Sequence, residues 1–186
     1  MPFSQSSQLS AIVGYAEQLQ PASVLDVGTG MGQYGFLLRT NLEHINLFDV
    51  EQGVQRGKEG WRVVIDGIEG FAGYRTPVHD YAYNRLMMGD AMQLLPALAD
   101  GAYELVMAID ILEHLSQDEG VQFLGHCRRI ASRAALISTP KVFVAQDVHA
   151  NPFENHRSLW SQQTLQSAGF MRTLDNAESW IAVCER

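Results

Sequence analysis

Four acidic residues lie at the ends of four short apolar segments of this sequence. They are Asp26, Glu69, Asp90 and Asp110. The carboxyl ends of the strands in an open α/β sheet face one crevice, and ligands bind there. Each acid alone could cap a turn or lie on the surface. The four together indicate a ligand-binding site at one edge of a sheet.

Glycines follow the first of these acids, in the stretch "VLDVGTGMGQYG". One reading is D-x-G-x-G-x-G, formed by Asp26, Gly28, Gly30 and Gly32. The other is G-x-G-x-x-G, the nicotinamide-dinucleotide fingerprint, formed by Gly30, Gly32 and Gly35. That fingerprint should begin directly after the strand, but here it begins two residues late. It also expects an acid at a strand end about 20 residues further on, and none stands there.

The first reading resembles the first motif of class I S-adenosylmethionine-dependent methyltransferases. The later segments "VVIDGIEG", "LMMGDA" and "VMAIDILEHL" resemble the corresponding strand ends of that family. The resemblance implies S-adenosyl-L-methionine as the cofactor. It covers nearly the whole chain, and "LEH" is similar to the branch of the family that acts on small molecules.

The resemblance also implies a role for each cofactor-binding residue. The glycine loop of Gly28, Gly30 and Gly32 would pass close to the cofactor, with Asp26 ordering the loop. Glu69 would bind the ribose hydroxyls, Asp90 and Ala91 would lie near the adenine, and Asp110 would lie beside the transferable methyl. The chain between Gly30 and Glu69 is longer than usual in the family. If residues 46–50 formed the second strand, Asp49 would take the place of Glu69.

The elements that must position these residues alternate along the chain. Apolar runs predict strands at 23–27, 62–68, 85–88, 103–109, 134–138, 171–174 and 180–184. Helices are expected at 9–19, 33–39, 76–84, 91–98, 118–130 and 161–168. This order predicts an α/β, single-domain Rossmann-like fold over residues 1–186. Its seven-stranded, mostly parallel sheet should carry helices on both faces and end in an antiparallel hairpin.

Two long segments without periodicity, 41–60 and 141–160, are expected to be loop insertions near the acceptor side. His114 and His156 are candidate catalytic residues, because histidine titrates near neutral pH. Arg157 and Trp160 are candidate substrate-binding residues. We expect a pocket lined by Asp110, His114, His156 and Trp160 that suits a small polar or anionic acceptor.

The sequence therefore predicts methyl transfer from S-adenosylmethionine to a small polar acceptor by in-line displacement. The alternatives are a protein of this fold that binds the cofactor without catalysis or acts as a partner subunit, and, less favoured, an NAD-binding enzyme. The net charge of −8 argues against a nucleic-acid partner. No signal peptide or long apolar run is seen, so we expect a cytoplasmic protein without a membrane partner. No metal site is expected. The oligomeric state and the acceptor's identity are open.

Overall fold

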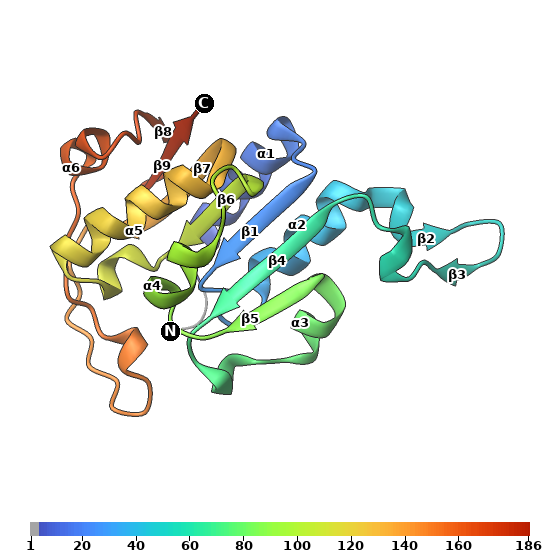
Figure 1. The fold of residues 1–186 in the computed structure, drawn as a ribbon, viewed down its shortest axis with the longest axis horizontal. Helices are drawn as coiled ribbons and strands as arrows, with labels where there is room; N and C mark the ends of the chain where they lie inside the picture. The colour runs from blue at the N-terminus through green and yellow to red at the C-terminus, as the bar shows by residue number, and fades with distance from the viewer. Residues whose placement is uncertain (1–3) are drawn as a thin grey trace.

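The computed structural model describes residues 4–186, and its core is a seven-stranded sheet in the order β5-β4-β1-β6-β7-β9-β8 (Figure 1). The strands are β1 Ser23–Val27, β4 Val64–Glu69, β5 Arg85–Met88, β6 Tyr103–Ile109, β7 Ala131–Pro140, β8 Arg172–Leu174 and β9 Ser179–Glu185. The first five are parallel to one another, and β9 runs antiparallel to both β7 and β8. The predicted Rossmann-like sheet with its C-terminal antiparallel hairpin is confirmed.

The central strand β6 is buried on both faces, because its apolar side chains alternate between two cores. Leu105 and Met107 belong to one core, whereas Val106 and Ala108 belong to the other. The first core is covered by α1 Ser6–Leu19, α2 Gln33–Glu43 and α3 Pro77–Ala82. The second is covered by α4 Ala91–Leu94, α5 Gln117–Ile130 and α6 Gln162–Ser167. A parallel strand between two helical layers is buried on both faces, so its sequence is a nearly continuous run of apolar residues.

Polar residues at the helix starts set where several helices begin. Thr76 caps α3 ahead of Pro77, and Ser161 caps α6. Ser116 and Glu119 form a capping box at the start of α5. α1 begins after Gln5, and the side chain of that residue makes no capping bond.

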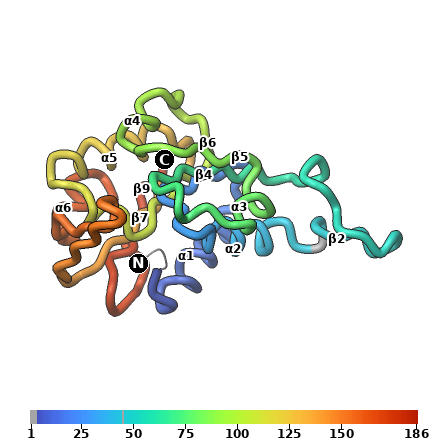
Figure 2. The backbone as a smooth tube through the Cα atoms, turned by 90° about the horizontal axis from the view of Figure 1, so that it is seen from below, coloured from blue at the N-terminus to red at the C-terminus, as the bar shows by residue number. Residues whose placement is uncertain are grey.

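The segment 41–60 does not lie near the acceptor side. α2 continues to Glu43, and a short antiparallel hairpin follows, β2 Phe48–Asp49 with β3 Val54–Gln55. α2 returns from the carboxyl end of β1 to the amino end of β4, so the hairpin projects from the opposite edge of the sheet (Figures 1 and 2). Asp49 is therefore far from the glycine turn, and the second strand of the fold ends at Glu69.

The segment 141–160 lies at the other edge, since it follows the carboxyl end of β7. A single 3-10 turn, Pro152–Glu154, interrupts its irregular course. Across residues 4–186, no helix combines the length and the apolar character that a membrane crossing needs.

Candidate active site

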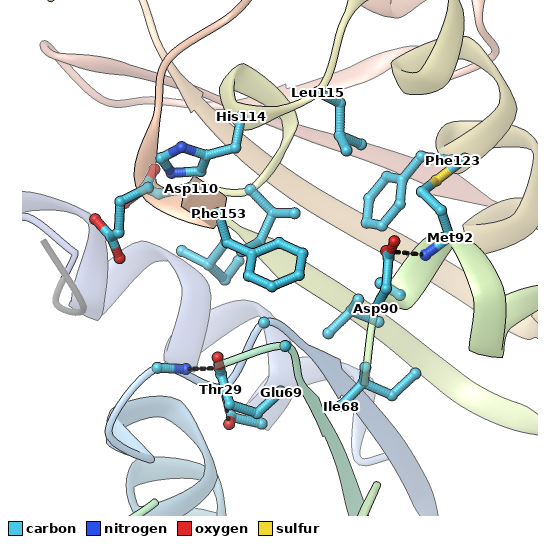
Figure 3. Close-up of a pocket in the computed structure, with 18 of the residues that line it drawn as sticks. Thr29, Ile68, Glu69, Asp90, Met92, Asp110, His114, Leu115, Phe123 and Phe153 are labelled. Carbon is cyan, nitrogen blue, oxygen red and sulfur yellow. Dashed lines mark hydrogen bonds between the residues drawn. The ribbon is translucent and has the colours of Figure 1, made fainter. Parts of the chain in front are cut away.

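A cavity of about 580 Å³ opens at the carboxyl edge of the parallel strands (Figure 3). It is lined by the turns that follow β1, β4, β5 and β6, together with the start of the described chain and residues 151–154 and 157 of the long segment. Its volume falls in the range of roughly 300–1,000 Å³ that is typical of small-molecule sites. Among the predicted residues, those in the lining are Gly28, Gly30, Glu69, Asp90, Ala91, Asp110, His114 and Arg157.

The turn after β1 needs its glycines. Gly28, Gly30 and Gly32 all have positive φ angles, of 76°, 55° and 92°, a region that side chains with a Cβ rarely adopt. A Cβ on Gly28 would also lie 2.1 Å from Cδ1 of Ile111. Gly32 does not line the cavity; it precedes the first residue of α2. The backbone of the turn can therefore approach a ligand closely at Gly28 and Gly30.

Asp26 lies beneath this turn and does not line the cavity. Its side chain is buried and accepts a hydrogen bond from the Tyr83 hydroxyl at 2.6 Å. The same hydroxyl oxygen accepts a bond from the backbone N–H of Gly35 at 3.1 Å. Burial raises the pKa of Asp26 to about 6, although the bond from Tyr83 opposes this change. Asp26 is thus connected through the Tyr83 hydroxyl to the first turn of α2.

Glu69 joins two turns at the end of β4. Its Oε2 accepts a bond from the backbone N–H of Gly30 at 2.8 Å, and its Oε1 accepts one from Phe71 at 2.8 Å. Burial raises the pKa of this carboxyl, and the two backbone donors oppose that effect. The carboxylate is fixed in place and lines the cavity, opposite His114 in Figure 3.

A buried histidine that the sequence did not reveal supports Glu69. The Nδ1 of His79 accepts a bond from the backbone N–H of Thr76 at 3.0 Å, so the neutral ring carries its proton on Nε2. That nitrogen lies 3.0 Å from the Thr29 hydroxyl, which in turn donates to Glu69 at 3.5 Å. Burial lowers the pKa of His79 and favours this neutral form.

Asp90 combines the two roles that the sequence left open. It caps α4 by accepting a bond from the backbone N–H of Met92 at 2.9 Å, and it also lines the cavity beside Ala91. Figure 3 shows its carboxylate beside Met92 and Phe123. This corner of the cavity therefore offers an acid among apolar side chains.

Asp110 has a strained backbone directly after β6, with a φ of 53°. Its carboxylate accepts bonds from Gln8 of α1 at 3.0 Å and from the Ser138 hydroxyl at 2.9 Å. A non-glycine residue in this region persists only where its surroundings hold it. Gln8 is buried, and nothing in the local sequence of α1 indicated that it reaches the site.

The acceptor side differs in part from the predicted pocket. His114 lines the cavity, and the ring of His156 lies 4.9 Å from it between centroids but outside the lining. Arg157 lines the cavity and forms an ion pair with Glu119 at 2.8 Å.

Trp160 belongs to the hydrophobic core and does not line the cavity, so its predicted place in the lining of the acceptor pocket is wrong. It is 2% exposed, and its indole N–H donates to the Ser158 hydroxyl at 2.8 Å. The indole fills the space above Gly120 of α5, where a Cβ would lie 2.2 Å from its Cζ2.

Glu113 is a buried acid that the sequence analysis did not single out. Its backbone carbonyl accepts bonds from the N–H groups of Arg157 and Ser158, at 2.7 and 3.1 Å. These bonds fasten the long segment to the turn after β6. Burial, with a smaller contribution from Asp110, raises the pKa of the Glu113 carboxyl to about 8.

Solved structures with this architecture include several methyltransferases. A S-adenosylmethionine-dependent methyltransferase from Archaeoglobus fulgidus is 14% identical, with a TM-score of 0.59, 97% of this chain covered and 95% of that one. The magnesium protoporphyrin IX methyltransferase of Synechocystis, solved with S-adenosylhomocysteine, is 19% identical, with a TM-score of 0.59, 97% of this chain and 83% of that one.

A third is the 1,6-didemethyltoxoflavin N1-methyltransferase of Burkholderia thailandensis, solved with 1,6-didemethyltoxoflavin and S-adenosylhomocysteine. It is 13% identical, with a TM-score of 0.61, 97% of this chain and 77% of that one covered. No protein-family model and no curated protein sequence matches the chain. At these identities the likeness concerns the fold. The chain has the fold of class I S-adenosylmethionine-dependent methyltransferases.

Proposed function

We propose that this protein transfers a methyl group from S-adenosylmethionine to a small polar acceptor. The observation that carries the proposal is the pairing of the glycine turn with Glu69 at the mouth of the cavity. The backbone of Gly30 is held by the carboxylate of Glu69 at 2.8 Å, and both residues line the same space. Asp90 and Asp110 line it from the ends of two further strands.

The residues present fit this cofactor. The glycine turn gives close approach to the backbone, which a Cβ would block. Glu69 would accept bonds from ribose hydroxyls, Asp90 and Ala91 would contact the adenine, and Asp110 would lie nearest the methionine part. The cofactor supplies an already activated methyl, so the protein's task is mainly to align the acceptor and exclude water.

The acceptor would enter from the side of His114 and Arg157. Arg157 lines the cavity and is half exposed, so its guanidinium can donate hydrogen bonds to an acceptor while Glu119 balances its charge. Phe153 projects into the opening in Figure 3 and supplies an apolar wall. A small polar or anionic molecule fits this combination. The molecules in the names of two similar structures, magnesium protoporphyrin IX and 1,6-didemethyltoxoflavin, are also small molecules.

Calorimetry with S-adenosylhomocysteine tests the cofactor assignment directly. We expect saturable binding by the wild type and none of NAD at the same concentration. Glu69→Ala should weaken S-adenosylhomocysteine by about 1.5–3 kcal/mol, the range for hydrogen bonds to a charged group. Asp49→Ala, on the β2–β3 hairpin, is the matched control and should change little. Equal affinities for Glu69→Ala and the wild type would contradict the assignment, and turnover with an acceptor separates catalysis from binding alone.

A further inference from the structure

Three metal-binding side chains meet beside the cavity, from parts of the chain that are distant in sequence. Glu113 and His114 belong to the 3-10 turn Leu112–His114 after β6, and His156 belongs to the segment 141–160. One donor atom from each of the three lies within 4.8 Å of the other two. Donors bound at about 2.0–2.2 Å to one zinc ion lie at most ~4.4 Å apart. A small side-chain rotation is therefore enough to close this cluster around an ion.

The hydrogen bonding of His114 orients its ring as a metal ligand requires. Its Nδ1 lies 3.3 Å from the carbonyl oxygen of Asn155. A carbonyl can only accept, so Nδ1 carries the proton and Nε2 is left with a free lone pair. Histidine ligands commonly donate their other ring N–H to a carbonyl or carboxylate in this way.

The Glu113 carboxylate is also held in place by a hydrogen bond. Its Oε2 accepts a bond from the Thr139 hydroxyl at 3.0 Å, while its side chain is 4% exposed. Within residues 4–186, no lysine or arginine forms an ion pair with it. Burial without a paired charge makes the ionised form of this carboxyl costly, and a bound cation would stabilise that form.

His156 is positioned by the backbone on both sides of it. Its own N–H donates to the carbonyl of Gln146 at 3.3 Å, and the next residue, Arg157, donates to the carbonyl of Glu113 at 2.7 Å. The ring packs against His114 and Phe143. These contacts keep the imidazole beside Glu113 instead of leaving it on a free loop.

We propose that Glu113, His114 and His156 bind a divalent transition-metal ion, such as Zn²⁺ or Mn²⁺, at the acceptor side of the cavity. Two imidazoles and one carboxylate form a ligand set that suits such ions and leaves coordination positions open. His114 lines the cavity, so an ion bound to it would lie next to the space where an acceptor would lie. This assignment gives the two histidines a ligand role in place of the general-base role suggested by their residue type.

The consequence for the reaction rests on the proposed function. A cation here would bind an acceptor through a hydroxyl oxygen and make that hydroxyl more acidic. The hydroxyl then loses its proton to solvent, a bond forms between the oxygen and the methyl carbon, and the bond from that carbon to sulfur breaks. The products are the methyl ether, S-adenosylhomocysteine and a proton. An oxygen acceptor is thereby favoured over a nitrogen or carbon acceptor.

Cobalt(II) titration of tag-free, chelator-treated full-length protein tests the site without any turnover. We expect one saturable site, visible as cobalt d–d absorption bands, and competition by Zn²⁺. His156→Ala should weaken cobalt binding at least tenfold. His149→Ala is the matched control, because His149 lies in the same segment and is exposed, and it should bind cobalt as the wild type does.

Glu113→Gln keeps the shape of the side chain and should also weaken cobalt binding at least tenfold, provided that thermal melting shows the variant to be folded. Absence of saturable binding to the wild type, or an equal loss in His149→Ala and His156→Ala, would overturn the proposal. Calorimetry with S-adenosylhomocysteine on the same samples keeps the two proposals apart. Cofactor binding without cobalt binding would refute the metal site alone, and cobalt binding without cofactor binding would refute the proposed function.

Discussion

The buried carboxylate of Asp26 links the first strand to the helix that follows it. The side chain is 2% exposed, and its bonded partner, the Tyr83 hydroxyl, also receives the Gly35 N–H. Burial disfavours the charged form of this carboxyl and raises its pKa from 3.8 to about 6. The folded state is therefore more stable when Asp26 is protonated. The free energy of unfolding should therefore depend on pH through this single residue.

The sign of that coupling gives a prediction for Asp26→Asn. The folded state holds the proton more tightly than the unfolded chain, so this stabilisation is complete below pH 3.8 and is lost as the pH rises through about 6. At 1.36 kcal/mol per pKa unit, the wild type should lose about 2–3 kcal/mol relative to Asp26→Asn over this interval. Urea unfolding at pH 4 and pH 7 measures the difference.

Asp175→Asn is the control for that experiment, since Asp175 is exposed in the turn between β8 and β9. Its stability should follow that of the wild type at both pH values. A parallel pH dependence of Asp26→Asn and the wild type would show that Asp26 does not titrate as its burial implies.

Among the elements, the parallel strands were the most predictable. The expected limits of β1, β5 and β6 are those of the structure, because each is a short apolar run bounded by glycine or polar residues. The hairpin of β2 and β3 was missed, because its strands are two residues long and mostly exposed. They pack against no core, so burial imposes no alternation of apolar and polar residues on their sequence.

The site was predictable where the chemistry follows a strand end, and not where it depends on contacts between distant segments. Glu69, Asp90 and Asp110 could be found because the fold brings the strand ends together. The burial of Trp160 depends on the absence of a side chain at Gly120 in α5. The contact of Gln8 with Asp110 likewise joins residues 102 positions apart. No local pattern carries such information.

The β2–β3 hairpin offers a prediction at the same scale. The backbone N–H of Arg56 donates to the carbonyl of Leu47 at 2.9 Å, so the two ends of the hairpin already meet. Replacing residues 48–55 with an Asn-Gly turn should therefore preserve the sheet. The hairpin contributes nothing to the lining of the cavity, and calorimetry should give an S-adenosylhomocysteine affinity within threefold of the wild type, about 0.7 kcal/mol. A larger loss with an unchanged melting temperature would place the hairpin in the binding site.

At the scale of the whole molecule, the cavity is assembled from residues spread between Ser4 and Arg157. It exists only when the sheet and both helical layers are formed, so a ligand in it binds the native state and not the unfolded chain. Binding should then raise the global stability by mass action. Ligand binding in the cavity can therefore be measured from the melting temperature, with no acceptor present.

Binding of S-adenosylhomocysteine should raise the melting temperature by several degrees. S-adenosylhomocysteine at 100 times its dissociation constant adds about 2.7 kcal/mol. A chain of this length gains roughly 2–4 °C per kcal/mol, so calorimetric melting should shift upward by about 5–11 °C. At the same ligand concentration, Glu69→Ala should shift much less, because its lower affinity leaves less of the native state bound. Equal shifts in the two proteins would mean that the ligand stabilises the fold from somewhere other than the cavity beside the glycine turn.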